Sequence, residues 1–146
     1  MSDKDSIKEI MSTTVRTVDS SGTVGKALQA MATYDIGSVV VVAGKNPVGI
    51  VTERDFARKY ARAKSMDMDW KIGTISSKPV ISVSPETKVW DALDLMVKKK
   101  IRQLPVVKDG RLVGIATERD IFKWIVRVIY SPNIPADLQK AIERTH

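Results

Sequence analysis

The chain has 146 residues, of which 43% are hydrophobic and 28% are charged, and these proportions are ordinary for a soluble globular protein. It has no cysteine, and its single histidine is the last residue, His146, so we expect no disulfide, no metal site built on thiolates or histidines, and no histidine-based catalytic triad. The net charge of +7 favours anionic ligands, whether small phosphates or nucleic acid, without choosing between them.

The N-terminal residues, Met1–Asp5, are polar and partly acidic, so we expect no signal peptide. No apolar run approaches the roughly 20 residues that are needed to span a bilayer. Together with the missing cysteines, these features predict a cytoplasmic protein without a membrane segment.

The first predicted elements are a short strand and a helix. The segment Val15–Val18 alternates apolar and polar residues with β-branched side chains, which is typical of a strand. Apolar residues then recur at the spacing of one face of an amphipathic helix, at Val24, Ala27, Leu28 and Met31.

A predicted β-hairpin and a second helix follow. Ser38–Val42 is β-branched and too short for a helix, so we expect a buried strand. Gly44–Pro47 supplies turn residues, and Val48–Val51 begins the next strand. At Thr52 this strand gives way to a helix that runs through Ala63.

The second half of the chain repeats the first. Residues 7–56 align with residues 72–121 without a gap, and Val48–Asp55 returns as Val113–Asp120 with one difference, Ala116 in place of Val51. The second copy therefore predicts the same elements, with Asp109 and Gly110 at its hairpin turn.

Each copy has the order strand, helix, strand, strand, helix (β-α-β-β-α), which places the protein in the mixed α/β (α+β) class. A unit of about 50 residues buries too little surface to be stable alone, so we expect the two copies to pack as an intramolecular pseudo-dimer with a cleft along its axis. We assign residues 1–65 to the first repeat, 66–130 to the second, and 131–146 to a linker with a short helix from Ala136 to Arg144.

The same motif stands at both junctions between the last strand and the last helix: Gly49-x-x-Thr52-x-x-Asp55 and Gly114-x-x-Thr117-x-x-Asp120. A threonine followed three residues later by an acidic residue is a capping box, which stabilises a helix start. The exposed N–H groups of such a start also bind phosphate, and the carboxylate can accept hydrogen bonds from a ribose diol. The residues alone leave both interpretations open.

The gap-free duplication, the element order and the paired motifs resemble a Bateman module, two cystathionine-β-synthase (CBS) domains in tandem. The resemblance covers about residues 7–130. Lys78-Pro79-Val80 and Ile101-Arg102-x-Leu104-Pro105 add further marks of that family.

The resemblance implies a regulatory module that binds an adenosyl ligand (AMP, ADP, ATP or S-adenosylmethionine) in two clefts between the repeats. The acidic residue of each motif would hold the ribose and the threonine the phosphate, while the first strand of the other repeat would take the base. Carried over by residue, one cleft would use Thr52, Asp55, Pro79, Val80, Ile81, Arg102 and Pro105. The other would use Thr14, Val15, Arg16, Thr117 and Asp120. Beside the two motifs, Arg54 and Arg119 could neutralise phosphate charge by their own charge.

The first repeat departs from the family pattern. Thr14, Gly37 and Val40 stand where the second repeat has Pro79, Arg102 and Pro105. We therefore expect the cleft of Thr52 and Asp55 to be the better binder, and the cleft of Thr117 and Asp120 the weaker one.

The helix after the second motif carries two apolar stripes, and one sheet would cover only one of them. The first is Ile121, Trp124, Ile125 and Val128, and the second is Phe122, Val126 and Ile129. The second stripe can be buried within the monomer or can form a subunit interface. In the family such helices form a homodimer, which we expect here.

The leading hypothesis is a regulatory module that binds an adenine nucleotide and acts on a protein partner in trans. The alternative is a nucleic-acid-binding protein that uses its basic surface, although aromatic residues are only 5% and no helix-turn-helix or zinc signature is present. We expect no enzyme, no catalytic cofactor and no metal, because Asp55 and Asp120 have no visible acid–base partner.

Overall fold

The computed structural model describes residues 5–77, 80–130, 133 and 135–144. The first copy contains β1 (Thr17–Asp19), α1 (Val24–Tyr34), β2 (Ser38–Ala43), β3 (Asn46–Thr52) and α2 (Glu53–Ala63). The second copy and the tail contain α3 (Val89–Lys99), β4 (Gln103–Lys108), β5 (Arg111–Thr117), α4 (Glu118–Tyr130) and α5 (Ala136–Glu143). Among the described residues, no helix is both long and apolar enough to cross a membrane.

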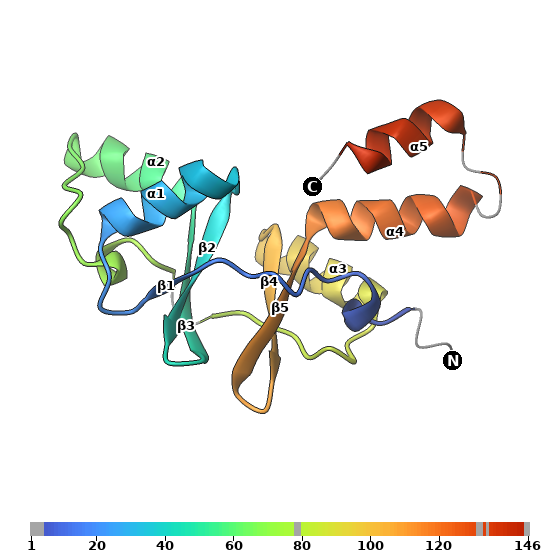
Figure 1. Cartoon of the computed structure of the whole chain (residues 1–146), viewed down its shortest axis with the longest axis horizontal. Coiled ribbons are helices and arrows are strands. Elements are labelled where there is room, and N and C mark those ends of the chain that lie inside the picture. The colour runs from blue at the N-terminus through green and yellow to red at the C-terminus, as the bar shows by residue number, and fades with distance from the viewer. Residues whose placement is uncertain (1–4, 78–79, 131–132, 134, 145–146) are drawn as a thin grey trace.

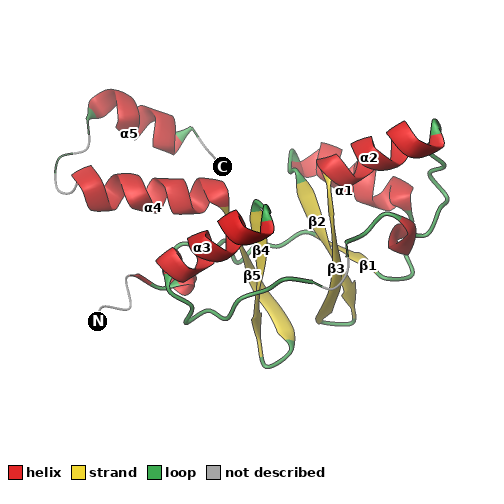
Figure 2. Ribbon diagram, turned by 180° about the vertical axis from the view of Figure 1, so that it is seen from behind, coloured by secondary structure: helices red, strands yellow, loops and turns green. Residues whose placement is uncertain are grey.

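The two copies form two small sheets that stand side by side, with the helices of each copy on the outside (Figures 1 and 2). In the first sheet β2 lies between β1, which is parallel to it, and β3, which is antiparallel. The second sheet is the antiparallel hairpin β4–β5. Strands β3 and β5 contact each other. The predicted pseudo-dimer is therefore confirmed, with the two hairpins at its centre.

Each core is completed by a segment from the other copy. The 3-10 turn Ile7–Glu9 packs into the core of the second copy, where Ile7 is fully buried, and Ile72–Thr74 packs into the first core in the same way. Equivalent hydrogen bonds attach both segments, from Ile7 N to the Thr87 oxygen at 2.8 Å and from Ile72 N to the Gly22 oxygen at 3.0 Å. The two copies thus share their cores by exchanging N-terminal segments.

The first strand of the second copy is the main correction to the predicted elements, because in the described residues only a parallel bridge between Val83 and Val106 remains of it. In the first copy, Val40 N donates to the Arg16 oxygen just before β1, and Ser20 N, just after β1, donates to the Val42 oxygen of β2. Pro105 and Pro85 occupy these positions in the second copy. Proline has no N–H, so both hydrogen bonds are lost and the strand shortens to one bridge.

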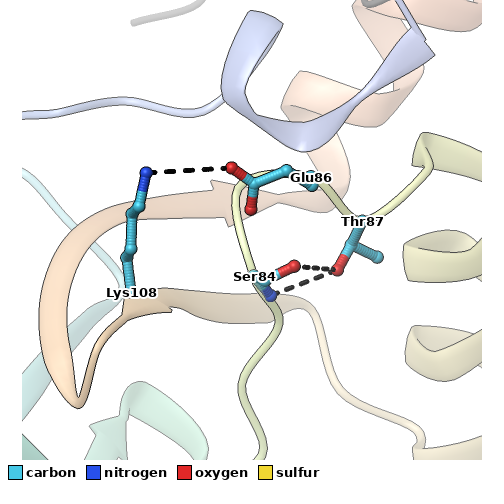
Figure 3. Close-up of polar contacts among 4 residues, drawn as sticks. All are labelled: Ser84, Glu86, Thr87 and Lys108. Carbon is cyan, nitrogen blue, oxygen red and sulfur yellow. Dashed lines mark hydrogen bonds and ion pairs between the residues drawn. The ribbon is translucent and has the colours of Figure 1, made fainter.

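The turn before the first helix of each copy is held by different side chains. In the first copy, Asp19 Oδ1 accepts hydrogen bonds from Ser21 N at 2.9 Å and Ser21 Oγ at 2.6 Å. Figure 3 shows the second copy, where Thr87 Oγ1 accepts from Ser84 N at 3.1 Å and lies 3.2 Å from Ser84 Oγ. An ion pair of 4.0 Å joins Lys108 to Glu86 beside it.

The predicted tail helix is confirmed to within one residue, because α5 begins at Ala136 and ends at Glu143 rather than Arg144. Most of the predicted linker, Ser131, Pro132 and Ile134, lies outside the described residues. Of the first stripe of α4, Ile121 and Trp124 are buried, whereas Val128 is 53% exposed. Trp124 packs edge-on against Trp90 with ring centres 5.0 Å apart. Of the second stripe, Val126 is buried, while Phe122 and Ile129 are 56% and 66% exposed.

Candidate functional site

Both predicted motifs form complete capping boxes at the starts of α2 and α4. Thr52 Oγ1 accepts a hydrogen bond from Asp55 N at 3.3 Å, and Asp55 Oδ2 accepts from Thr52 N at 2.8 Å and from Thr52 Oγ1 at 3.1 Å. Thr117 and Asp120 make the same three contacts, at 3.2, 2.9 and 3.0 Å. The capping interpretation is therefore confirmed in both copies.

Capping uses only one of the two carboxylate oxygens of Asp55. The other oxygen, Oδ1, accepts a long hydrogen bond of 3.4 Å from Ser77 Oγ, and the side chain is half-buried. A carboxylate has about four acceptor positions, so Oδ1 can still accept hydrogen bonds from a ligand hydroxyl while Oδ2 holds the helix start. The two interpretations of the motif are compatible in one residue.

The larger cavity, which we call the Asp55 cavity, has a volume of about 650 Å³ and lies between the start of α2 and the loop that joins α3 to β4. Six residues predicted for this cleft line it: Thr52, Arg54, Asp55, Ile81, Arg102 and Pro105. Val80 is half-buried and is not one of the lining residues, and Pro79 lies outside the described residues. The structure thus brings the motif of the first repeat together with residues of the second.

The second cavity, the Thr117 cavity, has a volume of about 440 Å³ and lies between the start of α4 and the loop that joins α1 to β2. Five residues predicted for this cleft line it: Thr14, Val15, Arg16, Thr117 and Arg119. Asp120 does not line it. The guanidinium of Arg16 lies over the ring of Tyr34, 3.6 Å from its centre, which is close enough for a cation–π contact.

The motif glycines face the exchanged segments and do not line either cavity. A Cβ at Gly114 would lie 2.6 Å from Met11 Sδ and 2.9 Å from the Ser12 oxygen. A Cβ at Gly49 would lie 3.2 Å from Ser76 Oγ. These glycines let the exchanged segments cross the last strand of the other copy, where Ser12 bridges Ile115 and Ser77 bridges Ile50.

The sequence interpretation missed part of the cationic rim of the Asp55 cavity. Arg58 from α2 and Lys99 and Lys100 from the end of α3 line it. All three side chains are also exposed to solvent. Aligning the copies points to this rim, since Tyr34-Asp35 stands where the second copy has Lys99-Lys100.

Among the described residues, no group of three or more acidic or histidine side chains is placed to hold a metal ion. What the two cavities share is a capped helix N-terminus, a threonine hydroxyl and arginine side chains at a cleft between repeats. This combination is suited to an anionic ligand.

Comparison with known proteins identifies the family from which this arrangement comes. The CBS domain profile matches the chain twice, at residues 7–62 and 72–127. This protein belongs to the CBS domain family. The tandem module that the internal repeat predicted is therefore confirmed.

Relatives of this CBS protein occur in archaea, plants and bacteria. An uncharacterised 17.7 kDa protein of Acidianus ambivalens is 35% identical over 84% of this chain and 74% of its own length. The CBS domain-containing protein CBSX3, mitochondrial, of Arabidopsis thaliana is 36% identical over 71% of this chain, but that match spans only 53% of the plant protein. The CBS domain-containing protein YhcV of Bacillus subtilis is 32% identical over 80% and 82% of the two chains.

Solved structures share the fold of the CBS module over most of its length. A putative acetoin utilization protein (AcuB) from Vibrio cholerae superposes with a TM-score of 0.74 at 27% identity, covering 93% of this chain and 96% of the other. The crystal structure of CBSX2 in complex with AMP superposes with a TM-score of 0.74 over 85% and 98% of the two chains. At 22% identity, this second likeness supports the fold alone.

Proposed function

We propose that this CBS module binds an adenine nucleotide in the Asp55 cavity and regulates a protein partner in trans. The observation that carries the proposal is the side chain of Asp55, whose Oδ2 caps α2 while Oδ1 has, among the described residues, only one long hydrogen bond. A ribose diol placed at Oδ1 would bring its phosphate toward the positive end of the α2 dipole and the Arg54 side chain, which also lines the cavity. A protein of the same fold, CBSX2, has been crystallised with AMP, which supports the choice of an adenosyl ligand.

Regulation would follow from differential binding. A ligand in the Asp55 cavity contacts α2 of the first copy and the α3–β4 loop of the second, so it would stabilise one relative arrangement of the copies over others. We place this regulation in the cytoplasm and expect no catalysis by the module itself. The partner would recognise the favoured arrangement.

A homodimer is part of this proposal. Phe122, Val128 and Ile129 expose apolar surface on α4, and a second copy of the chain would cover it. Sedimentation over a range of protein concentrations tests this, and a monomer at the highest concentration would refute it.

The test of the ligand is thermal shift and calorimetry with AMP, ADP, ATP, NAD, S-adenosylmethionine and guanine nucleotides. A ligand present at a hundred times its Kd stabilises the folded state by about 2.7 kcal/mol, which is easily measured. We expect stabilisation by adenine nucleotides and little by guanine nucleotides. No response to any adenine nucleotide would refute the proposal.

Asp55→Asn tests the assigned residue, because asparagine keeps an acceptor for the cap but loses the carboxylate. We expect it to remove most of the response to adenine nucleotides at the Asp55 cavity. Asp120→Asn makes the same change in the equivalent cap of α4 and controls for lost helix stability. If both variants respond to ATP as the wild type does, Asp55 does not hold the ligand.

A further inference from the structure

The loops that form the rims of the two cavities have the same backbone and opposite charges. Asp35 ends α1 and Lys100 ends α3, and both are in the left-handed conformation with φ of 51° and 55°. Two residues on, the Gly37 and Arg102 oxygens accept equivalent hydrogen bonds from Glu53 N and Glu118 N, at 3.0 and 2.9 Å. The rims therefore differ in side chains and not in shape.

The charges that line the cavities differ accordingly. The described residues of the Asp55 cavity include five cations and two acids: Arg54, Arg58, Lys99, Lys100 and Arg102 against Glu53 and Asp55. Those of the Thr117 cavity include three of each: Arg16, Arg102 and Arg119 against Asp35, Glu53 and Glu118. The first cavity is thus strongly cationic and the second is balanced.

Most cations of the Asp55 cavity are also available to a ligand. Within the described part of the chain, Arg54, Arg58, Lys99 and Lys100 form no ion pair, and Arg102 has only a long one of 3.8 Å to Glu118. Lys98, the neighbour outside the cavity, is paired with Asp94 at 2.8 Å. In the Thr117 cavity, by contrast, Arg16 is stacked on Tyr34.

Unpaired cations around a cleft repel one another, and each additional phosphate on a ligand relieves that repulsion. A monophosphate that reaches the start of α2 would leave Lys99 and Lys100 on the opposite rim without a counter-charge. A chain of phosphates can extend across the cleft toward them. In the Thr117 cavity the acidic groups, Asp35 above all, would repel the same chain.

We propose that the Asp55 cavity is selective for a nucleoside polyphosphate and the Thr117 cavity for a ligand with at most one phosphate. This rests on the proposed function, since it names which nucleotide each cavity of the module takes. Lys99 and Lys100 are the residues that select the longer phosphate chain.

The test compares ATP with AMP by calorimetry in magnesium-free buffer, where no cation offsets the phosphate charge. In the wild type we expect ATP to bind the Asp55 cavity at least about tenfold more tightly than AMP. Lys99→Gln with Lys100→Gln should weaken ATP binding about tenfold and change AMP binding by less than about threefold. The control, Lys98→Gln with Lys108→Gln, removes the same net charge away from the cavities and should leave both affinities within about twofold.

A gain of binding provides the reverse test. Asp35→Lys introduces at the Thr117 rim the side chain that Lys100 already carries on the same left-handed backbone, so the fold tolerates it. We expect ATP binding at the Thr117 cavity to tighten about tenfold, which raises the number of ATP molecules bound per chain.

The outcomes separate the two proposals. If ATP and AMP bind the wild type equally and the Lys99 and Lys100 double variant changes neither, the selectivity is refuted while nucleotide binding stands. An equal loss of ATP binding in the control double variant would also refute it, because general charge would then explain the effect. If no adenine nucleotide binds, both proposals fail.

Discussion

Buried positions of the two copies hold the same or similar side chains, whereas positions at the cavity rims hold different charges. The matched core pairs are Val24 and Val89, Ala27 and Ala92, Met31 and Met96, Val41 and Val106, and Ile72 and Ile7, all of them buried. At the rims, Asp35 corresponds to Lys100 and Gly37 to Arg102. Close packing restricts what a buried position accepts, while an exposed loop residue changes at little cost in stability. Two sites of different ligand preference can therefore share one interior.

The largest expected effect concerns the exchanged segments. Ile7→Ala and Ile72→Ala should each lower the free energy of unfolding by about 2–5 kcal/mol, because each opens a cavity in the core of the other copy. Urea denaturation measures this, and we expect one cooperative transition for both variants.

Val97→Ala on α3 is the control, since Val97 is exposed and its truncation should change stability by less than about 0.5 kcal/mol. If Ile7→Ala changes the free energy of unfolding as little as Val97→Ala does, the N-terminal segment does not belong to the second core. The two exchanged segments would then not be equivalent.

The second effect distinguishes the two motif glycines. Gly114→Ala should destabilise the protein by about 1–3 kcal/mol, because the new Cβ overlaps Met11 Sδ and the Ser12 backbone. Gly49→Ala should cost less, since its Cβ meets the Ser76 side chain at 3.2 Å. The melting temperatures of the two variants show which substitution destabilises the protein more. An equal loss of stability would contradict the prediction that the exchanged segment lies closer to Gly114 than to Gly49.

The smallest effect depends on pH. The hydrogen bonds from Ser21, with the nearby charge of Lys26, hold the pKa of Asp19 below its ordinary value of 3.8. Because its pKa is lower in the folded state, ionised Asp19 stabilises the fold at pH values above its ordinary pKa. This stabilisation is lost as the pH falls from there through the lowered pKa. In the equivalent turn of the second copy, the neutral hydroxyls of Ser84 and Thr87 replace the hydrogen bonds of this carboxylate.

Asp19→Ser introduces the residue that the second copy uses. We expect it to lower the melting temperature slightly at neutral pH and to reduce the loss of stability on acidification below pH 3.8. Ser84→Ala is the control, and its effect should be the same at all pH values. A wild-type acid profile in Asp19→Ser would show that this turn does not contribute to acid sensitivity.

The duplication, the element order and the start of α2 were predictable because they depend on local patterns and on comparison of the chain with itself. The short first strand of the second copy was not predicted, although Pro85 and Pro105 are visible in the sequence, because the lost hydrogen bonds appear only when strand partners are known. The gathering of Lys99 and Lys100 with Arg58 at one cavity was missed for the same reason. This cavity is lined by residues of both copies, and the spacing of residues within one copy does not indicate which residues of the other copy lie beside them.

The exchange of segments has a consequence for the order in which the protein is assembled during synthesis. The first core cannot close until Ile72 has left the ribosome, well after α1 and α2 have emerged. Ile7 is made before the rest of the module, but its hydrogen-bond partner is Thr87, so it cannot be buried until the strands and helices of the second copy follow. Such long-range contacts slow folding and leave apolar surface exposed in the meantime. The N-terminal segment is thus the first part of the module to be made and among the last to reach its place.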